Sequence, residues 1–337
     1  MSEGGGKLAG LAFRRYTDSD EPAVLDLLQT SLGWLADEHH TAFFRWKHRD
    51  NPFGPSPAWV ALDGERTVGL RVLLRWEFDR DDGPEIGPAF AVRAVDTATD
   101  PAYQGRGIFS GLTLHAIDEL TGEGLHFIFN TPNDQSLPGY LKMGWQVVGK
   151  LPVSVRPRSP ATVARMARAR TAADLWSMPT DAGLDAVEVL ADTQALGTLL
   201  ASQPHTGGLR TRRTPAFVQW RYAGFPPLGY RILLQGSRLE EGFVVFRLRR
   251  RGQALEAVVG DVLVPDGDRR VTAALLRSVP RAAGADYAIR LGGGGGRGAG
   301  YVPLPRQGPV LTWRAIAEKT QPPLESWRLS LGDVELF

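Results

Sequence analysis

The feature that most constrains the fold of this sequence is a segment that occurs twice. Residues 42–47 (AFFRWK) resemble residues 216–221 (AFVQWR) at an offset of 174, and Pro52 and Pro226 keep the same offset. In each copy an aromatic-led strand pattern follows, and then a turn and a strand that carries a glycine. Chance similarity of two amphipathic segments is the alternative, but it would not produce shared order and spacing. We therefore interpret the sequence as a duplication, which predicts two related α/β units.

The length of the chain supports this division, because 337 residues exceed what one ordinary hydrophobic core organises. The sequence contains no cysteine, which excludes disulfide bonds, thiolate metal sites and a cysteine nucleophile. No apolar run reaches the roughly 18–20 residues of a membrane span, and residues 1–10 are expected to be a flexible leader without signal-peptide character. We therefore expect a cytoplasmic protein with no membrane partner.

Charge is distributed unevenly along the chain. Residues 1–150 carry 14 Lys and Arg against 21 Asp and Glu, whereas residues 151–337 carry 25 against 16. A basic half can indicate nucleic-acid binding. The arginines here are scattered through mixed apolar sequence, apart from a short run at 247–251. We therefore expect no nucleic-acid partner.

The first half has the alternating pattern of an α/β unit. The predicted elements are a strand at 12–15, helices in the apolar-periodic stretch up to residue 50, a hairpin at 58–62 and 67–78, a strand at 89–99, a helix from 108, a strand at 125–130, a short helix at 136–142 and a strand from 145. Residues 152–180 are rich in proline, then in arginine and alanine, and show a short helix but no convincing strand. The expected regions are a leader at 1–10, a first domain at 11–150, a linker at 151–180, a second domain at 181–315 and a C-terminal tail at 316–337.

A glycine-containing turn at 104–109 follows the strand at 89–99 and leads into the next helix. Exposed backbone N–H groups and the positive end of a helix favour a phosphate at such a turn, and glycine permits its close approach. The pattern alone is weak, because two glycines between a strand and a helix often form only a connection. It is not a Walker A loop and does not fit the dinucleotide fingerprint. The second copy has residues 265–268 (PDGD) at this place and lacks the paired glycines.

Residues 96–109 (DTATDPAYQGRGIF) resemble the acetyl-CoA signature of the GCN5-related N-acetyltransferase (GNAT) superfamily, in which a proline and Gln/Arg-x-x-Gly-x-Gly/Ala open a helix. Residues 133–145 (NDQSLPGYLKMGW) resemble the family's Asn…Tyr-x-x-x-Gly-Phe element. The resemblance covers roughly residues 90–148, and the tandem arrangement is similar to that of Eis-type acetyltransferases. It implies an α/β (α+β) fold of two GNAT-like domains, each a mixed, mostly antiparallel sheet flanked by helices, with a degenerate second copy. Phe109 departs from the pattern, because most members have Gly or Ala there.

The resemblance also implies a co-substrate, acetyl-CoA or another acyl-CoA, and no metal. The backbone of Thr97, Ala98 and Thr99 would contact the pantetheine arm, and Asn133 would contact the cofactor on the far side of the splayed strands. The residues that would hold the pyrophosphate are Gln104, Gly105, Arg106, Gly107, Ile108 and Phe109.

Three groups could carry the proton transfers. Tyr140 stands where many relatives have a general acid that protonates the leaving CoA thiolate, and packing under the sheet is its alternative role. Only a neutral amine attacks a thioester, and Asp96 could accept the amine proton directly or through water; its alternative role is that of a solvated or capping carboxylate. Eis-type relatives also end in a Phe whose carboxylate reaches the active site, so Phe337 is a further candidate, with a packing strand as the alternative.

Other polar and glycine-rich positions are interpreted more simply. His115 is expected on the surface of the helix from residue 108. Glu38, His39 and His40 fall near the expected acceptor entrance, where they could contact substrate, but a third ligand at metal-binding spacing is missing. The glycine run at 292–296 is followed by no helical pattern, so we expect a flexible loop there.

The sequence therefore predicts an N-acyltransferase that moves an acetyl group from acetyl-CoA to a primary amine of a small molecule by direct attack. A catalytically silent acyl-CoA-binding sensor or scaffold is the alternative, and Asn133 and Tyr140 at family spacing count against it. Aminoacyl transfer from charged tRNA, which related tandem folds perform, would not require the intact turn at 104–109. The sequence does not determine the acceptor, the acyl length or the oligomeric state.

Overall fold

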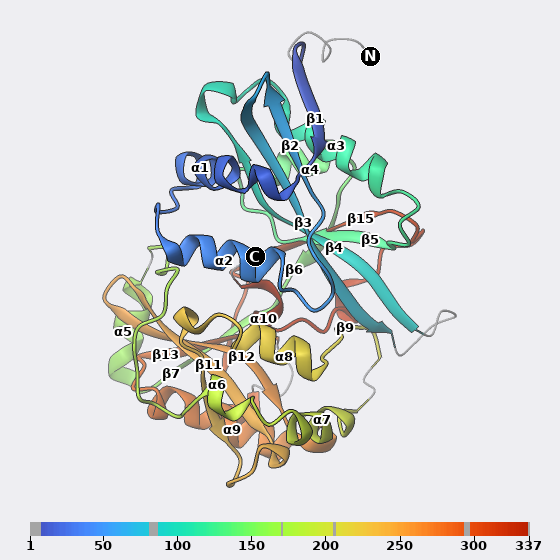
Figure 1. Ribbon diagram of the computed structural model, residues 1–337. Coiled ribbons are helices and arrows are strands. Elements are labelled where there is room, and N and C mark those ends of the chain that lie inside the picture. Colours follow the sequence, from blue (N-terminus) through green and yellow to red (C-terminus); the bar gives the residue numbers. More distant parts are fainter. Residues whose placement is uncertain (1–7, 81–86, 170, 205–206, 293–296, 336–337) are drawn as a thin grey trace.

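The computed structural model in Figure 1 describes residues 8–80, 87–169, 171–204, 207–292 and 297–335. The first sheet consists of β1 (Leu11–Arg15), β2 (Ala58–Asp63), β3 (Arg66–Arg80), β4 (Gly87–Thr99), β5 (Phe127–Asn130), β6 (Gln146–Lys150), β9 (Leu209–Thr211) and β15 (Val310–Ala315). The second consists of β7 (Val153–Pro157), β8 (Leu184–Asp185), β10 (Arg231–Leu234), β11 (Phe243–Arg251), β12 (Ala254–Leu263), β13 (Tyr287–Leu291) and β14 (Val302–Leu304).

The helices flank these sheets. They are α1 (Glu21–Leu32), α2 (Glu38–His48), α3 (Ile108–Leu120), α4 (Leu137–Lys142), α5 (Pro160–Arg168), α6 (Ala186–Val189), α7 (Thr193–Ala201), α8 (Pro215–Tyr222), α9 (Arg269–Ala282) and α10 (Leu331–Val334). Both sheets are mostly antiparallel, although β4 runs parallel to β5 and β12 runs parallel to β13. The predicted mixed α/β fold class is confirmed, and the elements predicted between residues 12 and 148 are present with slightly different ends.

The two sheets exchange strands. The strand order is β1-β2-β3-β4-β5-β15-β6 in the first sheet, with β9 beside β3, and β8-β10-β11-β12-β13-β7-β14 in the second. Strand β7 directly follows β6 in the sequence, yet it pairs with β13 and β14. Strand β15 follows β14 in the sequence, yet it lies between β5 and β6. Each half therefore completes the sheet of the other half at the equivalent position.

This exchange crosses the boundaries that we expected from the sequence. The prediction of no strand in residues 152–180 was wrong, because β7 lies there. The strand follows Pro152 and ends at Pro157, and it owes its extended form to partners 130 or more residues away in sequence. Strand β15 falls in the range expected for the second domain and joins the first sheet. The division of the chain into separately folding domains stays a prediction.

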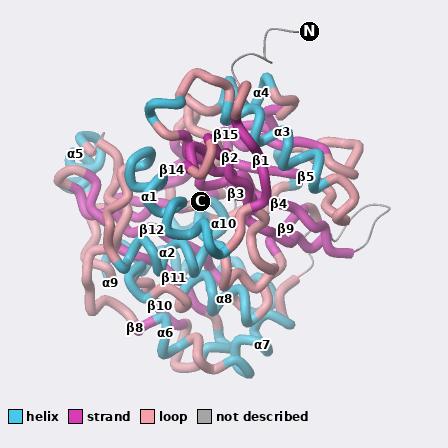
Figure 2. The backbone as a smooth tube through the Cα atoms, turned by 45° about the horizontal axis from the view of Figure 1, so that its top comes forward, coloured by secondary structure: helices cyan, strands magenta, loops and turns pink. Residues whose placement is uncertain are grey.

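Hydrophobic clusters lie on both faces of each sheet. A large cluster between the two sheets takes side chains from α1, α2, α8 and the C-terminal segment, and Figures 1 and 2 show α2 and α10 in this central layer. Helices α3 and α4 cover the other face of the first sheet, and α9 covers the other face of the second. Burial of these apolar faces drives the layered arrangement.

The duplicated segments lie on α2 and α8, where they pack against each other. The indole Nε1–H of Trp46 donates to the backbone oxygen of Trp220, and that of Trp220 donates to the backbone oxygen of Trp46, each at 2.8 Å. The two rings stack with centroids 5.1 Å apart. Reciprocal contacts of this kind arise when two equivalent units are related by a two-fold axis. The interface therefore supports the duplication read from the sequence.

Candidate active site

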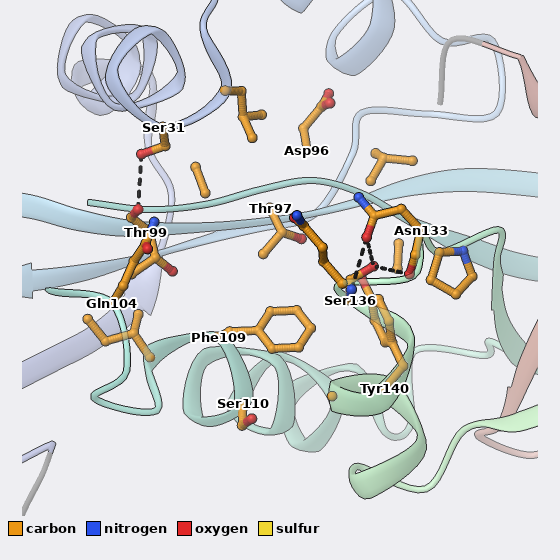
Figure 3. Close-up of a pocket in the computed structure, with 18 of the residues that line it drawn as sticks. Ser31, Asp96, Thr97, Thr99, Gln104, Phe109, Ser110, Asn133, Ser136 and Tyr140 are labelled. Atoms are coloured by element: carbon orange, nitrogen blue, oxygen red, sulfur yellow. Dashed lines mark hydrogen bonds between the residues drawn. The ribbon is translucent and has the colours of Figure 1, made fainter. Parts of the chain in front are cut away.

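A cavity of about 750 Å³ lies where β4 and β5 diverge. The parallel pairing of these strands ends at Arg93 and Phe129, while β4 continues to Thr99. In open α/β sheets ligands bind in such crevices, and a strand edge offers its N–H and C=O groups to the amides of an extended ligand. Figure 3 shows the cavity with its lining side chains.

The glycine-containing turn lies at this cavity, before the first residue of α3. Gly105 and Gly107 have φ angles of +74° and +88°, a conformation that L side chains rarely adopt. A Cβ atom at either position would meet no atom within 4 Å. The backbone conformation therefore requires glycine here, and the space around the turn is open. Gly107 is the N-cap of α3 and supplies no side-chain cap, which leaves the helix N-terminus available to an anion.

The structure brings the predicted site residues together. Those that line the cavity are Asp96, Thr97, Ala98, Thr99, Gln104, Gly105, Gly107, Ile108, Phe109, Asn133 and Tyr140. Arg106 is the exception, because its exposed guanidinium stacks on the Tyr103 ring, 4.5 Å from the ring centroid. Asn133 Oδ1 accepts hydrogen bonds from the N–H and the hydroxyl of Ser136, both at 2.9 Å, and so fixes the turn before α4 (Figure 3).

Phe109 fits because the facing helix carries a glycine. Its ring is nearly perpendicular to that of Tyr140, with centroids 5.3 Å apart. A Cβ atom at Gly139 would come within 2.7 Å of the Phe109 ring. The aromatic side chain is thus accommodated beside Tyr140 and Gly139.

Strand β4 bulges opposite Arg71 of β3, where the register of the β3–β4 pairing shifts. Asp96 lies in the bulge with φ of +39°, which is uncommon for a residue other than glycine. The Asp96 carboxylate points away from Tyr140, toward the opposite side of β4 (Figure 3). The bulge therefore presents an acid on one side of the strand and a phenol on the other.

The Asp96 carboxylate is held by two residues of α2. Its Oδ2 lies 2.7 Å from both Lys47 Nζ and His48 Nε2. Burial would raise the pKa of Asp96, but the charge of Lys47 and the hydrogen bond from His48 hold it well below its ordinary value of 3.8. Asp96 is therefore an ionised, charge-balanced carboxylate, which makes it a weaker base than an isolated one.

His48 is buried and neutral at pH 7. Burial lowers the pKa of His48 below its ordinary value of 6.5, and the interaction with Asp96 offsets only part of this effect. Its Nε2–H donates to Asp96, and its Nδ1 accepts from the Ser56 hydroxyl at 3.0 Å. The imidazole thus orients the carboxylate without adding a charge.

The Tyr140 side chain is buried on the α3 side of the first sheet. It is 4% exposed and packs between Phe109 and Trp145. Its hydroxyl accepts a hydrogen bond from Arg71 Nη1 at 2.8 Å. The alternative role considered from the sequence, packing under the sheet, therefore coexists with a polar contact to its hydroxyl.

Sequence reasoning missed Lys47, His48 and Arg71. Lys47 and His48 could have been found from the duplication, because they follow Trp46 at the positions that Arg221 and Tyr222 occupy after Trp220 in the second copy. No signal singled out Arg71. Ser31 at the end of α1 was also missed; it lines the cavity and donates to the Thr99 carbonyl at 3.0 Å.

The remaining candidates lie elsewhere. His115 Nε2 on α3 is 2.9 Å from Glu119 Oε1, outside the cavity. Glu38 and His39 line a second cavity, which residues 224–227 also border, whereas the buried His40 contacts Asp37. Among the described residues no three His, Asp or Glu side chains form a group that could hold a metal ion. Phe337 and residues 293–296 of the glycine run lie outside the described residues.

The first half matches a known family. Residues 12–148 match the family model described as an acetyltransferase (GNAT) domain. This region is a GNAT domain. No curated protein matches the sequence. The GNAT assignment nevertheless agrees with the site, because the glycine turn, the bulged β4 and Tyr140 all fall within the matched residues.

Solved GNAT structures share the fold of most of the chain. A GCN5-related N-acetyltransferase from Anabaena variabilis has a TM-score of 0.64 at 12% identity, over 91% of this chain and 73% of that chain. A GCN5-related N-acetyltransferase from Kribbella flavida has a TM-score of 0.59 at 16% identity, over 91% of this chain and 71% of that chain. Eis1 from Mycobacterium abscessus has a TM-score of 0.55 at 13% identity, over 91% of this chain and 73% of that chain. At these identities the likeness concerns the fold. Within the described residues, none of the helices has the length and apolar character needed to span a bilayer.

Proposed function

We propose that this protein is an acyl-CoA-dependent N-acyltransferase that transfers an acetyl group from acetyl-CoA to a primary amine of a small molecule. The observation that supports this most strongly is that the predicted site residues meet at one cavity. The turn at 104–109, the edge of β4, Asn133 and Tyr140 are spread along the sequence and line one cavity of a GNAT domain.

The residues at the cavity fit an acyl-CoA. The uncapped N-terminus of α3 suits the pyrophosphate, because its N–H groups and the helix dipole favour negative charge. The edge of β4 at residues 97–99 suits the amides of the pantetheine arm, and Asn133 borders the cavity from the turn before α4. These residues would place the thioester of acetyl-CoA between Asp96 and Tyr140.

The two polar side chains suit direct attack by the amine. Asp96 would accept the proton of the substrate ammonium, directly or through water, while Lys47 and His48 fix its carboxylate. Tyr140 would donate its hydroxyl proton to the CoA sulfur as the C–S bond breaks. The products are then an amide and free CoA.

A panel of acyl-CoAs against a panel of amines, including aminoglycosides, polyamines, amino sugars and peptides, tests the proposal by thiol release. We expect release that requires both an acyl-CoA and an amine, and acetyl-CoA should raise the melting temperature. Stabilisation without thiol release for any pair would favour the silent binding module. No stabilisation by any acyl-CoA would overturn both functions.

A further inference from the structure

Arg71 is a buried arginine beside Tyr140 that has no role in the reaction steps proposed above. It lies on β3 opposite the bulge of β4, and its side chain is 0% exposed. Its guanidinium carbon is 5.3 Å from the centroid of the Tyr140 ring and 5.9 Å from that of Phe109. The cation therefore lies directly behind the side chains that line the reacting end of the cavity.

Only one of the three guanidinium nitrogens of Arg71 has a hydrogen-bond partner among the described residues. Nη1 donates to the Tyr140 hydroxyl at 2.8 Å and also to Thr97 Oγ1. Nε and Nη2 are buried and have no hydrogen-bond partner in the part of the chain that the structure describes. No described carboxylate lies within ion-pair distance of the guanidinium. By contrast, the buried Arg213 and Arg247 are each paired with carboxylates.

Such a cation is costly to bury without an anion. It is also specific to the half that carries the glycine turn. Arg71 stands two residues after Gly69 on β3, and the residue two after Gly242 on β11 is the buried Val244. A purely structural need of the sheet would be met by an apolar residue, as it is in the second half.

We propose that Arg71 is a positioning residue that acts through Tyr140, stabilising the negative charge that forms at the phenol oxygen during acyl transfer. This inference rests on the proposed function. When the amine nitrogen bonds to the acyl carbon, the C–S bond breaks and its electron pair goes to sulfur. The Tyr140 proton passes to that sulfur, and the phenolate left behind is hydrogen-bonded to Arg71. The acylated nitrogen loses its extra proton to solvent, which gives the neutral amide, and a proton from solvent restores the phenol.

Arg71 could instead have a purely structural role, in which its hydrogen bond to Thr97 stabilises the bulge of β4. A residue with that structural role would affect folding and cofactor binding whether or not Tyr140 has a hydroxyl. An electrostatic partner of Tyr140 would affect turnover only while that hydroxyl is present, and a lysine that keeps the charge would replace it in part.

The experiment is a double-mutant cycle on the full-length protein with Arg71→Met, Tyr140→Phe and both together, measured as kcat and as KM for acetyl-CoA. We expect Arg71→Met to lower kcat at least tenfold with less than a threefold change in KM. In the Tyr140→Phe background the same substitution should change kcat less than twofold. Arg71→Lys should recover a substantial part of the lost kcat, and Arg75→Met on the same strand should match wild type.

A binding measurement makes the test independent of turnover. Wild-type protein should prefer CoA over desulfo-CoA at pH 8, where part of the thiol is ionised, and Arg71→Met should lose most of that preference. If Arg71→Met does not fold, the same comparison is made with Arg71→Gln, which also removes the charge and should lose most of the preference. An equal kcat loss in both backgrounds, or an unchanged preference for the thiol, would overturn the inference. Absence of thiol release by wild type would instead overturn the proposed function.

Discussion

The two halves of this protein place a similar loop after equivalent strands, but only the first loop leaves a helix N-terminus free. Two residues after β4 and after β12, a short 3-10 helix begins at a proline, Pro101 and Pro265. In the first half Gly107 precedes α3 and provides no side-chain cap. In the second half the Asp268 carboxylate accepts from the N–H groups of Arg270 and Val271 at the start of α9. The fold alone therefore does not make an anion site; the turn residues decide whether the amides are available.

The two halves also differ in what binds the aspartate of the bulged strand, which is Asp96 on β4 and Asp261 on β12. In the first half Asp96 is bonded to His48 and borders the cavity. In the second half Asp261 accepts from the hydroxyl of Tyr222 at 2.5 Å, and Tyr222 is the residue offset by 174 from His48. Arg213 joins Asp261 to Asp333 of the C-terminal segment. The Asp261 carboxylate is therefore linked to the C-terminal segment through Arg213, whereas the Asp96 carboxylate is held by two residues of α2.

The largest expected effect breaks the comparison at the turn. Gly107→Asp should abolish the thermal stabilisation by acetyl-CoA, because it places a carboxylate where the pyrophosphate charge would lie. Gly107→Ala has the same left-handed backbone without the charge and should keep part of the stabilisation, at a cost of about 1 kcal/mol in folding. Asp268→Ala in the second half should cost about 1 kcal/mol as a lost cap and leave acetyl-CoA binding unchanged. Equal stabilisation of Gly107→Asp and wild type would contradict the assignment of the turn.

The next effect concerns the phenol. Tyr140→Phe should lower kcat by roughly 10²–10⁴-fold, the usual contribution of a general acid, with little change in the KM for acetyl-CoA. The matched control is Tyr301→Phe, which removes the hydroxyl of a buried tyrosine that contacts α9 in the second half. Steady-state thiol release measures both variants. A Tyr140→Phe enzyme with wild-type kcat would show that Tyr140 only packs under the sheet.

The interface between the duplicated helices tests their two-fold relation. Trp46→Phe and Trp220→Phe each remove one indole N–H and leave a buried carbonyl without that donor. Each should lower the free energy of unfolding by about 1–3 kcal/mol. Because the two rings share one stack, the double variant should lose less than the two single losses together. Denaturant unfolding gives the three values, and strongly unequal single losses would argue against equivalent roles.

The smallest effect is a pH dependence of folding that only the first half should show. Since the pKa of His48 is lowered in the folded protein, the unfolded chain binds more protons below pH 6.5. Stability should therefore fall as pH drops from 7.5 to 5.5, by about 1.4 kcal/mol per unit of pKa difference once the pH is below both values. His48→Tyr copies the second half, where burial raises the pKa of Tyr222 well above 10, and should flatten this fall.

Melting temperatures at several pH values measure the difference. The control is His115→Gln on α3, which removes a partly exposed histidine outside the cavity and should leave the slope unchanged. Identical slopes for wild type and His48→Tyr would mean that the buried pair does not set the pH dependence.

Much of the first half could be predicted because its signals are local. The apolar periodicities marked the strands and helices, and the left-handed φ values of Gly105 and Gly107 explain why the turn needs those residues. Nearly all the predicted cofactor residues line one cavity, whereas Arg106 does not; its exposed side chain stacks on the ring of Tyr103, which itself lines the cavity. The direction in which one side chain of a turn points depends on neighbours that the turn sequence does not name.

The sequence by itself determined the duplication, the GNAT domain at residues 12–148 and the difference between the two turns, because each can be read from residue identities and their order along the chain. Only the tertiary structure decided which strands complete each sheet. The short strands β7 and β15 take their extended form from partners in the other half. The same holds for Lys47, His48 and Arg71, which reach Asp96 and Tyr140 across the fold. A long-range contact has no periodicity in the sequence, because packing and burial bring its two sides together only when the chain folds.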